Sequence, residues 1–314
     1  MKTYDAIIIG GGPGGSTAAS ALAKAGKSVL VLERERFPRF HIGESLIPYG
    51  NEELRAIGVW EKLESSGFMP KLGAEFVLGN SQAVNRVIFG KHLPARYAGT
   101  FQVERSRFDA LLLEHAAECG AEVWHETRVE SADVSAEGVR VTCTRAGATT
   151  ELRSRWILDA SGRDAFLGRE LKLPKTDLGL PKKFATFAHF RGVIRNPAPA
   201  DGHITVVRLD FGWCWIIPLD AEKTSVGLVQ TLSHFQSTGL KPEECFERVV
   251  ASTPELQRRL GQSARVSDYA FAGDYTYRHL QNAGPRWLLI GDAAGFIDPI
   301  FSSGVMLAIK SGHL

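Results

Sequence analysis

The sequence predicts an α/β fold: a three-layer, doubly wound dinucleotide-binding domain with an inserted, mainly antiparallel β-sheet domain. Three observations predict it. A glycine-rich turn near residue 10 joins an apolar strand pattern to a small-residue helix, an apolar strand with a turn and a helix recurs at the C-terminal end, and alternating strand patterns fill residues 184–230. We expect a discontinuous nucleotide-binding domain at 1–75, 100–175 and 270–314, and a substrate-side sheet domain at 76–99 and 176–269.

The first element is a β-α-β unit. YDAIII (4–9) is a continuous apolar run of the kind that a buried parallel strand needs, TAASALAKAG follows as a helix, and SVLVLE (28–33) forms the second strand. FDALLLEHAAECG (108–120) has helical spacing of its apolar positions and ends at a glycine. Short alternating segments over 122–159 predict a small antiparallel sheet that returns to a buried strand.

The predicted elements between residues 184 and 260 belong to the second domain. Three long strands are predicted, at 184–193, 203–219 and 224–230, and residues 242–260 are predicted to be helical. The segment from Arg286 onward, in contrast, is predicted to form a buried strand, a turn and the start of a helix, and to return to the nucleotide-binding layer.

Composition excludes several classes of function. The chain of 314 residues carries 37 basic and 35 acidic side chains, a net charge of +2, which provides no field to hold nucleic acid or an anionic membrane. No signal segment and no apolar run of about eighteen residues occur. The four cysteines lack metal-ligand spacing, so we expect no metal site and a cytoplasmic protein with buried thiols.

The glycine-rich turn predicts a dinucleotide site. In Gly10-x-Gly12-x-x-Gly15, the first glycine permits the tight turn, the second the close approach of a pyrophosphate, and the third close packing of helix on strand. Glu33 ends the second strand, where an acid binds ribose hydroxyls, and the remaining candidates of this site are Pro13, Gly14 and Arg34. The motif alone does not distinguish FAD from NAD.

Three later segments resemble the FAD-dependent aromatic hydroxylase superfamily. IGDAAGFIDP (290–299) resembles its GD motif, which implies that Asp292, beside Gly291, binds the ribityl chain. WILDASGR (156–163) resembles the turn beside the cofactor and adds Asp159 and Gly162. QVERSRFDALLLEHA resembles the helix that carries a flavin-contacting Gln or Arg, which makes Gln102 and Arg105 candidates. Together they imply FAD.

Two signatures resemble the flavin-dependent halogenases, most closely the phenol- and pyrrole-type branch. Trp213-x-Trp215-x-Ile217-Pro218 matches WxWxIP, and Phe296-x-x-Pro299-x-x-Ser302-x-Gly304 matches FxxPxxSxG. FPRFHIGESLIP (37–48) resembles a further family segment and places Ser45 near the flavin. The resemblance implies that reduced FAD, supplied by an NAD(P)H-dependent flavin reductase, O2 and chloride or bromide yield hypohalous acid for an aromatic small molecule or a carrier-protein-tethered substrate.

The tryptophans allow two interpretations. In a strand, Trp213, Trp215 and Ile217 point to one face, and Cys214 and Ile216 to the other. Tryptophans in a sheet are commonly core residues. The resemblance instead makes them a catalytic wall that keeps organic substrate away from the flavin, and a wall must also be packed, so both interpretations can hold.

The resemblance also assigns a lysine and a halide site. Lys71 matches the lysine that takes up the hypohalous acid, either as an ammonium that polarises it or as a neutral amine that forms a haloamine. The N–H groups of Ser303 and Gly304 open a helix and suit a halide, although a serine there also serves as an N-cap. Pro299 and Gly304 are further cofactor candidates. Phe301 stands where the tryptophan-specific branch has a glutamate, which favours a phenol or pyrrole substrate.

The sequence leaves other functions open. One is a different flavoenzyme of this fold, a monooxygenase or a geranylgeranyl-reductase-like oxidoreductase. Another is a non-catalytic or truncated flavin-binding protein, because halogenases continue past the position of SGHL (311–314).

Overall fold

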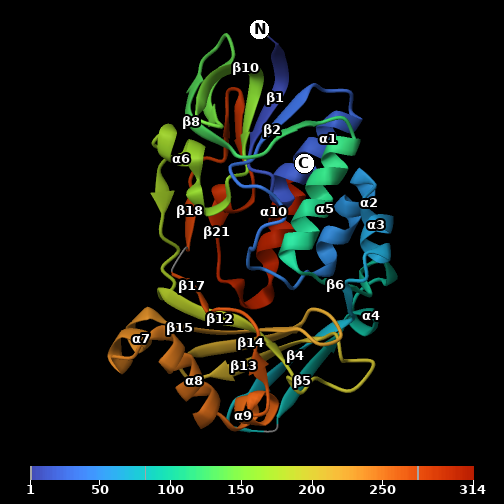
Figure 1. Ribbon diagram of the computed structural model, residues 1–314, viewed down its shortest axis with the longest axis vertical. Coiled ribbons are helices and arrows are strands. Elements are labelled where there is room, and N and C mark those ends of the chain that lie inside the picture. The colour runs from blue at the N-terminus through green and yellow to red at the C-terminus, as the bar shows by residue number, and fades with distance from the viewer. Residues whose placement is uncertain (1, 82, 274–275) are drawn as a thin grey trace.

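The computed structural model describes residues 2–81, 83–273 and 276–314 and places them around two large β-sheets, one above the other in Figure 1. The upper sheet has the strand order β19-β20-β10-β1-β2-β7. Its strands are β1 (Thr3–Ile9), β2 (Val29–Leu32), β7 (Glu122–Trp124), β10 (Ala148–Asp159), β19 (Ala283–Gly284) and β20 (Trp287–Leu289). β1 runs parallel to β2 and β10, which confirms the predicted α/β fold of the nucleotide-binding half.

Both faces of the upper sheet are covered because its strands are apolar throughout. On one face, Ile8 and Val31 pack with Ala18 of α1 (Pro13–Lys24) and Leu113 of α5 (Arg105–Glu118). On the other face, Ile7 packs with residues of β8 (Thr127–Val134), β9 (Val139–Arg145) and α6 (Phe166–Glu170). Continuous apolar strands of this kind need cover on both sides.

β10 belongs to two pairings. Its first half, Ala148–Ser154, pairs antiparallel with β9, and its second half lies parallel to β1 and β20. The predicted antiparallel sheet over 122–159 is therefore β8-β9-β10. β7, which was predicted to join it, instead lies parallel to β2 at the sheet edge.

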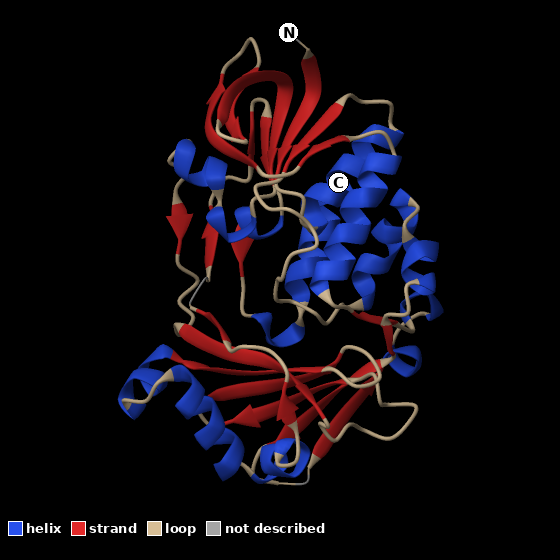
Figure 2. Ribbon diagram, in the orientation of Figure 1, coloured by secondary structure: helices blue, strands red, loops and turns tan. Residues whose placement is uncertain are grey.

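A group of helices lies beside the upper sheet and above the lower one (Figure 2). α10 (Ser303–His313) packs against α1 so closely that a Cβ on Gly312 would lie 2.3 Å from the carbonyl oxygen of Gly14. α2 (Asn51–Ile57) and α3 (Trp60–Ser65) complete this group, and their apolar core includes Leu54, Leu63 and Ile309. The C-terminal helix thus lies beside the glycine turn that opens α1.

The lower sheet has the order β16-β12-β15-β14-β13-β4-β5, with β17 beside β12. It is antiparallel except for the β13–β4 pair. Its strands are β4 (Gly73–Leu78), β5 (Val84–Ile88), β12 (Lys183–Arg191), β13 (Ile204–Leu209), β14 (Gly212–Pro218), β15 (Thr224–Thr231), β16 (Ala264–Arg265) and β17 (Ala270–Ala272). Beside it lie α7 (Leu232–Thr238), α8 (Pro242–Ser252) and α9 (Pro254–Leu260). Phe246 and Leu256 pack on one face together with Cys214 and Ile216.

Two predicted elements are divided in the structure. The strand predicted over 203–219 is a hairpin, β13 and β14, because Asp210 and Phe211 form a two-residue turn between the paired residues Leu209 and Gly212. The helix predicted over 242–260 breaks at Thr253, since a residue before proline is disfavoured in the helical region.

The sheets also refine the predicted domain limits. Residues 73–75 begin β4 and residues 270–272 form β17, so both segments belong to the lower sheet although they were assigned to the nucleotide-binding domain. At each of these segments the chain passes from one sheet to the other, and no turn or linker pattern in the sequence marks the change of domain.

Shorter elements connect the halves. β3 (Met69–Lys71) pairs with β6 (Thr100–Gln102), and β18 (Tyr277–His279) pairs with β11 (Lys175–Thr176) and β21 (Gly295–Phe296). The remaining helical turns are α4 (Phe89–His92), η1 (Pro48–Gly50), η2 (Ala95–Tyr97), η3 (Gly162–Asp164), η4 (Gly291–Ala293) and η5 (Pro299–Phe301).

Candidate active site

A cavity of about 380 Å³ lies between the two halves. Its upper wall comes from the carboxyl ends of β1, β2 and β10, where α/β sheets bind ligands. Its lower wall comes from the face of the lower sheet. The predicted site residues that line it are Gly10, Gly12, Pro13, Gly14, Glu33, Arg34, Ser45, Arg105, Gly162, Trp213, Trp215, Asp292 and Gly304.

The glycine turn has the geometry that the motif predicted. A Cβ on Gly15 would lie 1.9 Å from the carbonyl oxygen of Gly10, so α1 and β1 approach too closely for any side chain. Gly10 has a φ of +95° and passes close to Ala160. Around Gly12, in contrast, the nearest neighbour of a Cβ would be an Arg39 nitrogen at 3.8 Å, which leaves this side of the turn accessible to a ligand.

The N-terminus of α1 faces this turn. Gly12 is its N-cap, and no side-chain hydrogen bond caps the helix in the described chain, so the first N–H groups remain available to an anion. A glycine turn, an uncapped helix and a lining that includes Asp292 fit the pyrophosphate and ribityl chain of FAD.

Glu33 fixes the turn from the neighbouring strand. Its carboxylate is almost fully buried and accepts hydrogen bonds from the N–H of Gly11 at 2.7 Å and of Glu35 at 2.9 Å. A carboxylate has about four lone-pair sites, so these two bonds leave capacity for ribose hydroxyls. Arg34, next along the chain, is half exposed and pairs with Asp164.

Asp292 also lines the cavity. Burial raises the pKa of its carboxyl group, opposed by Arg105 and Arg163. The Tyr277 hydroxyl donates to the main-chain oxygen of Asp292, and the Gly291 N–H donates to the Ser311 hydroxyl at 2.9 Å. These bonds fix the turn η4 to α10 and β18.

Arg105 is held in a buried ion pair that sequence reasoning missed. Its guanidinium donates to both oxygens of Asp109, at 2.7 and 2.9 Å, and to the main-chain oxygen of Ile42 at 2.6 Å. Arg39 donates to the same carboxylate at 2.9 Å. Burial acts to raise the pKa of Asp109, but the two guanidinium groups hold it below its usual range.

Not every predicted cofactor residue lines the cavity. Asp159 is fully buried, and its oxygens accept from the N–H groups of Ser161 at 2.9 Å and Leu167 at 2.7 Å. Gln102 is also buried and donates to the main-chain oxygen of Gly202 at 3.0 Å. Both side chains therefore fix the backbone around the cavity. Gly15 and Gly291 likewise lie behind its wall, where they allow close packing.

The tryptophan strand confirms the predicted division of its faces. Trp213, Trp215 and Ile217 line the cavity and form one cluster with Phe187 and Ile204, whereas Cys214 and Ile216 lie in the opposite core. The indole N–H of Trp215 donates to Ser225 at 3.1 Å, while that of Trp213 is buried without a partner among the described residues. The residues are thus both a packed cluster and a cavity wall.

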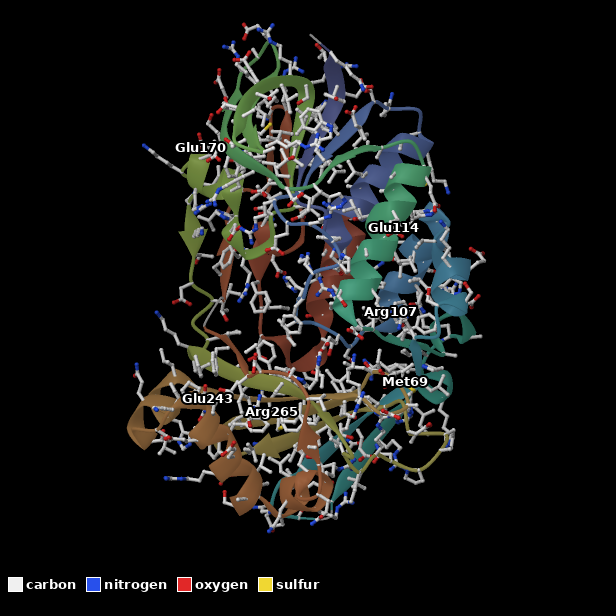
Figure 3. All side chains as sticks on the ribbon, viewed as in Figure 1. Met69, Arg107, Glu114, Glu170, Glu243 and Arg265 are labelled. Atoms are coloured by element: carbon white, nitrogen blue, oxygen red, sulfur yellow. The ribbon has the colours of Figure 1, made fainter. Side chains whose placement is uncertain are left out.

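Lys71 is among the largest fully buried side chains of the described residues, with an exposed fraction of 1%. It ends β3, which begins at Met69, labelled in Figure 3 near the junction of the helices with the lower sheet. Its ammonium nitrogen donates to the Ser45 hydroxyl at 2.8 Å and the Leu46 main-chain oxygen at 2.5 Å. Burial lowers its pKa from 10.5 to about 7. Lys71 lies behind the cavity wall, and Ser45 connects it to the cavity.

Only part of the predicted halide site lines the cavity. Gly304 lines the cavity at the start of α10, but Ser303 does not. Ser302, the N-cap residue, has a φ of 58° and makes no side-chain capping bond within the described chain, so its predicted capping role is absent there. A Cβ on Gly304 would lie 3.9 Å from an Asp292 carboxyl oxygen. Pro299 begins η5, and its side chain is not among those described.

A second buried carboxylate was also missed. Glu44, between Gly43 and Ser45, lines the cavity with an exposed fraction of 1%, and its Oε1 lies 2.8 Å from Nε2 of His189 on β12. The two residues are 145 positions apart, so no local spacing indicates the pair.

No helix within residues 2–81, 83–273 and 276–314 has the length and apolar character needed to cross a membrane.

Comparisons with known proteins agree with this geometry. The model of the FAD binding domain family matches residues 3–314. The chain is 35% identical to the 1H-pyrrole-2-carbonyl-[peptidyl-carrier protein] chlorinase of Pseudomonas fluorescens, over 99% of this chain and 74% of that protein. It is 33% identical to the corresponding brominase of Pseudoalteromonas luteoviolacea, over 99% and 76%.

A solved structure also matches almost the whole chain. The myxobacterial chondrochloren halogenase, described as a variant of FAD-dependent halogenases, superposes with a TM-score of 0.92 at 32% identity, over 99% of this chain and 73% of that one. With the cavity, the glycine turn and both halogenase signatures, these matches show that the chain belongs to the flavin-dependent halogenases of the FAD-binding-domain family.

Proposed function

We infer that this enzyme uses reduced FAD, O2 and chloride or bromide to make hypohalous acid, and that Lys71 directs the halogen to an electron-rich aromatic ring. The observation that carries this proposal is the complete burial of Lys71 one hydrogen bond from a residue of the cavity wall. A lysine is almost never fully buried without a role, because desolvation of the ammonium is costly.

The upper wall supplies the groups that would hold FAD. The N-terminus of α1 and Gly12 would bind the pyrophosphate, Glu33 the ribose, and Asp292 the ribityl chain. When bound, FAD supplies the reducing electrons with which O2 is activated to oxidise halide.

Trp213, Trp215 and Ile217 would exclude the aromatic substrate. Their buried side chains, two of which are rigid indole rings, form one wall of the cavity. A halide ion is small enough to share the cavity with FAD, whereas an aromatic ring is stopped by this wall. The organic substrate would therefore meet the halogen only at Lys71.

Lys71 suits either of the two halogen-transfer chemistries. With a pKa of about 7, the side chain can be present as ammonium or amine near neutral pH. The ammonium would donate to hypohalous acid and polarise its O–halogen bond, and the amine would take the halogen as a haloamine with loss of water. Ser45 and Leu46 accept two hydrogen bonds and fix the nitrogen for either step.

The proposed substrate is a pyrrole or phenol, free or tethered to a carrier protein. Two relatives are named for pyrrole-2-carbonyl groups on peptidyl-carrier proteins. At the position of Phe301, the chain offers an exposed aromatic side chain and no carboxylate. Pyrroles and phenols already activate their ring carbons, so they depend less on a nearby base. A separate NAD(P)H-dependent flavin reductase would supply reduced FAD.

The test separates halide oxidation from halogen transfer. Purified protein is given FAD, a flavin reductase with NADH, O2 and bromide, and hypobromite is trapped with a small enol in parallel with a pyrrole thioester of a carrier protein. Wild type should yield trapped bromine and brominated pyrrole. Lys71→Ala should retain trapped bromine and lose pyrrole bromination at least 100-fold.

The controls distinguish a wrong activity from a wrong role of Lys71. Lys62→Ala removes an exposed lysine of α3 and should leave both products unchanged. If wild type binds FAD but releases only hydrogen peroxide, the proposed activity is wrong for this chain. If Lys71→Ala brominates pyrrole normally, the role of the lysine is wrong.

A further inference from the structure

Loop 42–46 (Ile42–Leu46) contains a buried carboxyl oxygen that no described residue bonds. Oε1 of Glu44 contacts Nε2 of His189 at 2.8 Å, but Oε2 is inaccessible to solvent and finds no hydrogen-bond partner within the residues that the structure describes. Buried carboxyl oxygens are nearly always satisfied, so an orphaned one indicates a missing partner. Glu44 is itself one of the residues that line the cavity, so this oxygen lies close to the space that a ligand would fill.

The position of Glu44 is tightly determined by its neighbours. Its main-chain oxygen accepts from the N–H of Val103 at 2.7 Å. The residue before it, Gly43, and Ile42 receive the guanidinium of Arg105, and the residue after it, Ser45, receives Lys71. Glu44 therefore lies next to Ser45, the residue that bonds the lysine, on a segment that is fixed on both sides.

His189 connects this carboxyl group to the outside. It lies on β12, with 13% of its side chain exposed, whereas that of Glu44 has 1%. Phe40, itself more than half exposed, contacts the imidazole edge-on with a ring-centroid distance of 6.0 Å. Glu44 lines the cavity, and its carboxyl group contacts an imidazole that is partly exposed, so the two groups form a two-membered path for protons.

The reaction requires such a path. Oxidation of halide by anionic reduced FAD balances as FADH⁻ + O2 + X⁻ + 2H⁺ → FAD + HOX + H2O. O2 takes two electrons from FADH⁻ and two from the halide, and two protons must enter a cavity whose lower wall is formed by Trp213, Trp215 and Ile217. General acids positioned for such steps contribute about 10²–10⁴-fold in rate.

We propose that Glu44 and His189 form a proton relay that supplies the cavity during halide oxidation, with Glu44 as the donor and His189 as the group that reprotonates it from solvent. In each transfer, the Glu44 O–H bond breaks toward an oxygen atom in the cavity. A new O–H bond then forms at Glu44 as the His189 N–H bond breaks, and solvent reprotonates the imidazole. The proposal rests on the halide-oxidising function inferred above.

The test compares Glu44→Gln with a matched pair elsewhere. Glutamine keeps the size and a hydrogen-bond acceptor for His189 but cannot deliver a proton. Glu44→Gln should give at least tenfold less trapped hypobromite per reduced FAD oxidised, with hydrogen peroxide in its place, and Glu44→Asp should recover part of the loss. Glu118→Gln, which alters the His115–Glu118 contact remote from the cavity, should behave as wild type.

Binding supplies a readout that is independent of turnover. FAD affinity, measured by quenching of flavin fluorescence, should remain within twofold of wild type in Glu44→Gln, as should the melting temperature within experimental error. If hypobromite is lost in proportion to FAD affinity or stability, Glu44 has a structural role and the relay is wrong.

His189→Gln provides the second variant if Glu44→Gln does not fold. Slow reprotonation should make proton delivery rate-limiting, so its solvent deuterium isotope effect on hypobromite formation should exceed that of wild type. Equal isotope effects and equal yields would overturn the relay. A wild type that makes no hypobromite contradicts the proposed function itself, whereas a wild type that makes it and an equally active Glu44→Gln contradict only the relay.

Discussion

The glycine turn at Gly10–Gly15 and loop 42–46 line the same cavity, and they are built in opposite ways. In the turn, missing side chains create the shape: a Cβ on Gly15 would lie 1.9 Å from a backbone oxygen. In loop 42–46, side chains create it, through Arg105 on Ile42, His189 on Glu44 and Lys71 on Ser45. Backbone shape and side-chain bonding thus build the two parts of one site.

The difference has a thermodynamic consequence. A turn defined by absent side chains tolerates no added atom where the backbone is close, and none of its own residues is charged, although the buried carboxylate of Glu33 accepts from Gly11. A loop defined by buried charges depends on each partner, because removal of one leaves the other uncompensated. Substitutions in the two regions should therefore fail for different reasons.

The largest effect is expected within the turn itself. Gly15→Ala should separate α1 from β1 and destabilise the protein by about 5 kcal/mol or more, with loss of FAD binding, because the obstructing atom is backbone. Gly12→Ala, whose Cβ would have 3.8 Å of space, should fold as wild type and lose only FAD affinity. Urea unfolding and FAD titration check the pair, and equal stability of the two variants would contradict the argument.

Asp109→Asn should produce the next effect, in the loop region. It leaves the buried guanidinium of Arg105 without its carboxylate, at a cost of about 3–5 kcal/mol. Loop 42–46 should loosen because the same guanidinium holds Ile42. Amide hydrogen exchange should be faster at residues 42–46 and unchanged in the glycine turn. Equal protection of loop 42–46 in the variant would show that Arg105 does not control it.

Lys71 should make stability depend on pH. Its folded pKa of about 7 lies below the unfolded value of 10.5, so the unfolded chain binds more protons between these values and stability rises with pH there. The gain is about 1.4 kcal/mol per pH unit across that window. Lys71→Met should be more stable than wild type at pH 7, with the difference shrinking by pH 9.5.

Urea unfolding of both proteins at pH 7.0 and 9.5 measures this prediction. Exposed lysines titrate alike in the two proteins and cancel in the comparison. A constant difference at both pH values would mean that Lys71 is charged to the same extent in the folded and unfolded states.

The smallest effect compares two tryptophans of one strand. Trp215→Phe removes a hydrogen bond to Ser225 and should cost about 1–2 kcal/mol. Trp213→Phe removes an indole N–H that has no partner in the described chain and should change stability by less than about 1 kcal/mol. Thermal unfolding of both variants checks the order, and the reverse order would indicate that Trp213 bonds a group outside the described residues.

The same contrast explains what the sequence could predict. The glycine turn and the faces of β14 follow from local spacing, because chain geometry fixes glycine contacts and strand alternation. Burial of Lys71 was expected only from a family resemblance, since an isolated lysine is normally exposed. Glu44–His189 and Arg39–Asp109 join residues 145 and 70 positions apart, and only the folded chain brings them together.

Where local patterns misled, a competing local rule was stronger. Asp210-Phe211 turned one apolar run into a hairpin, and Pro254 divided one amphipathic helix. Asp159 ends a buried strand, as cofactor-binding acids do, yet the hydrogen bonds that it accepts from two backbone N–H groups account for its burial.

The alternation of β14 also bears on how long such a catalyst survives. Thiols and thioethers are the side chains that electrophilic halogen destroys fastest, and of the described residues that line the cavity none is a cysteine or a methionine. Cys214 lies between the two wall tryptophans in sequence, yet its sulfur faces the opposite core. A shift of one residue in the register of β14 would expose that sulfur to the oxidant, so the pairing of this strand protects the enzyme from its own product.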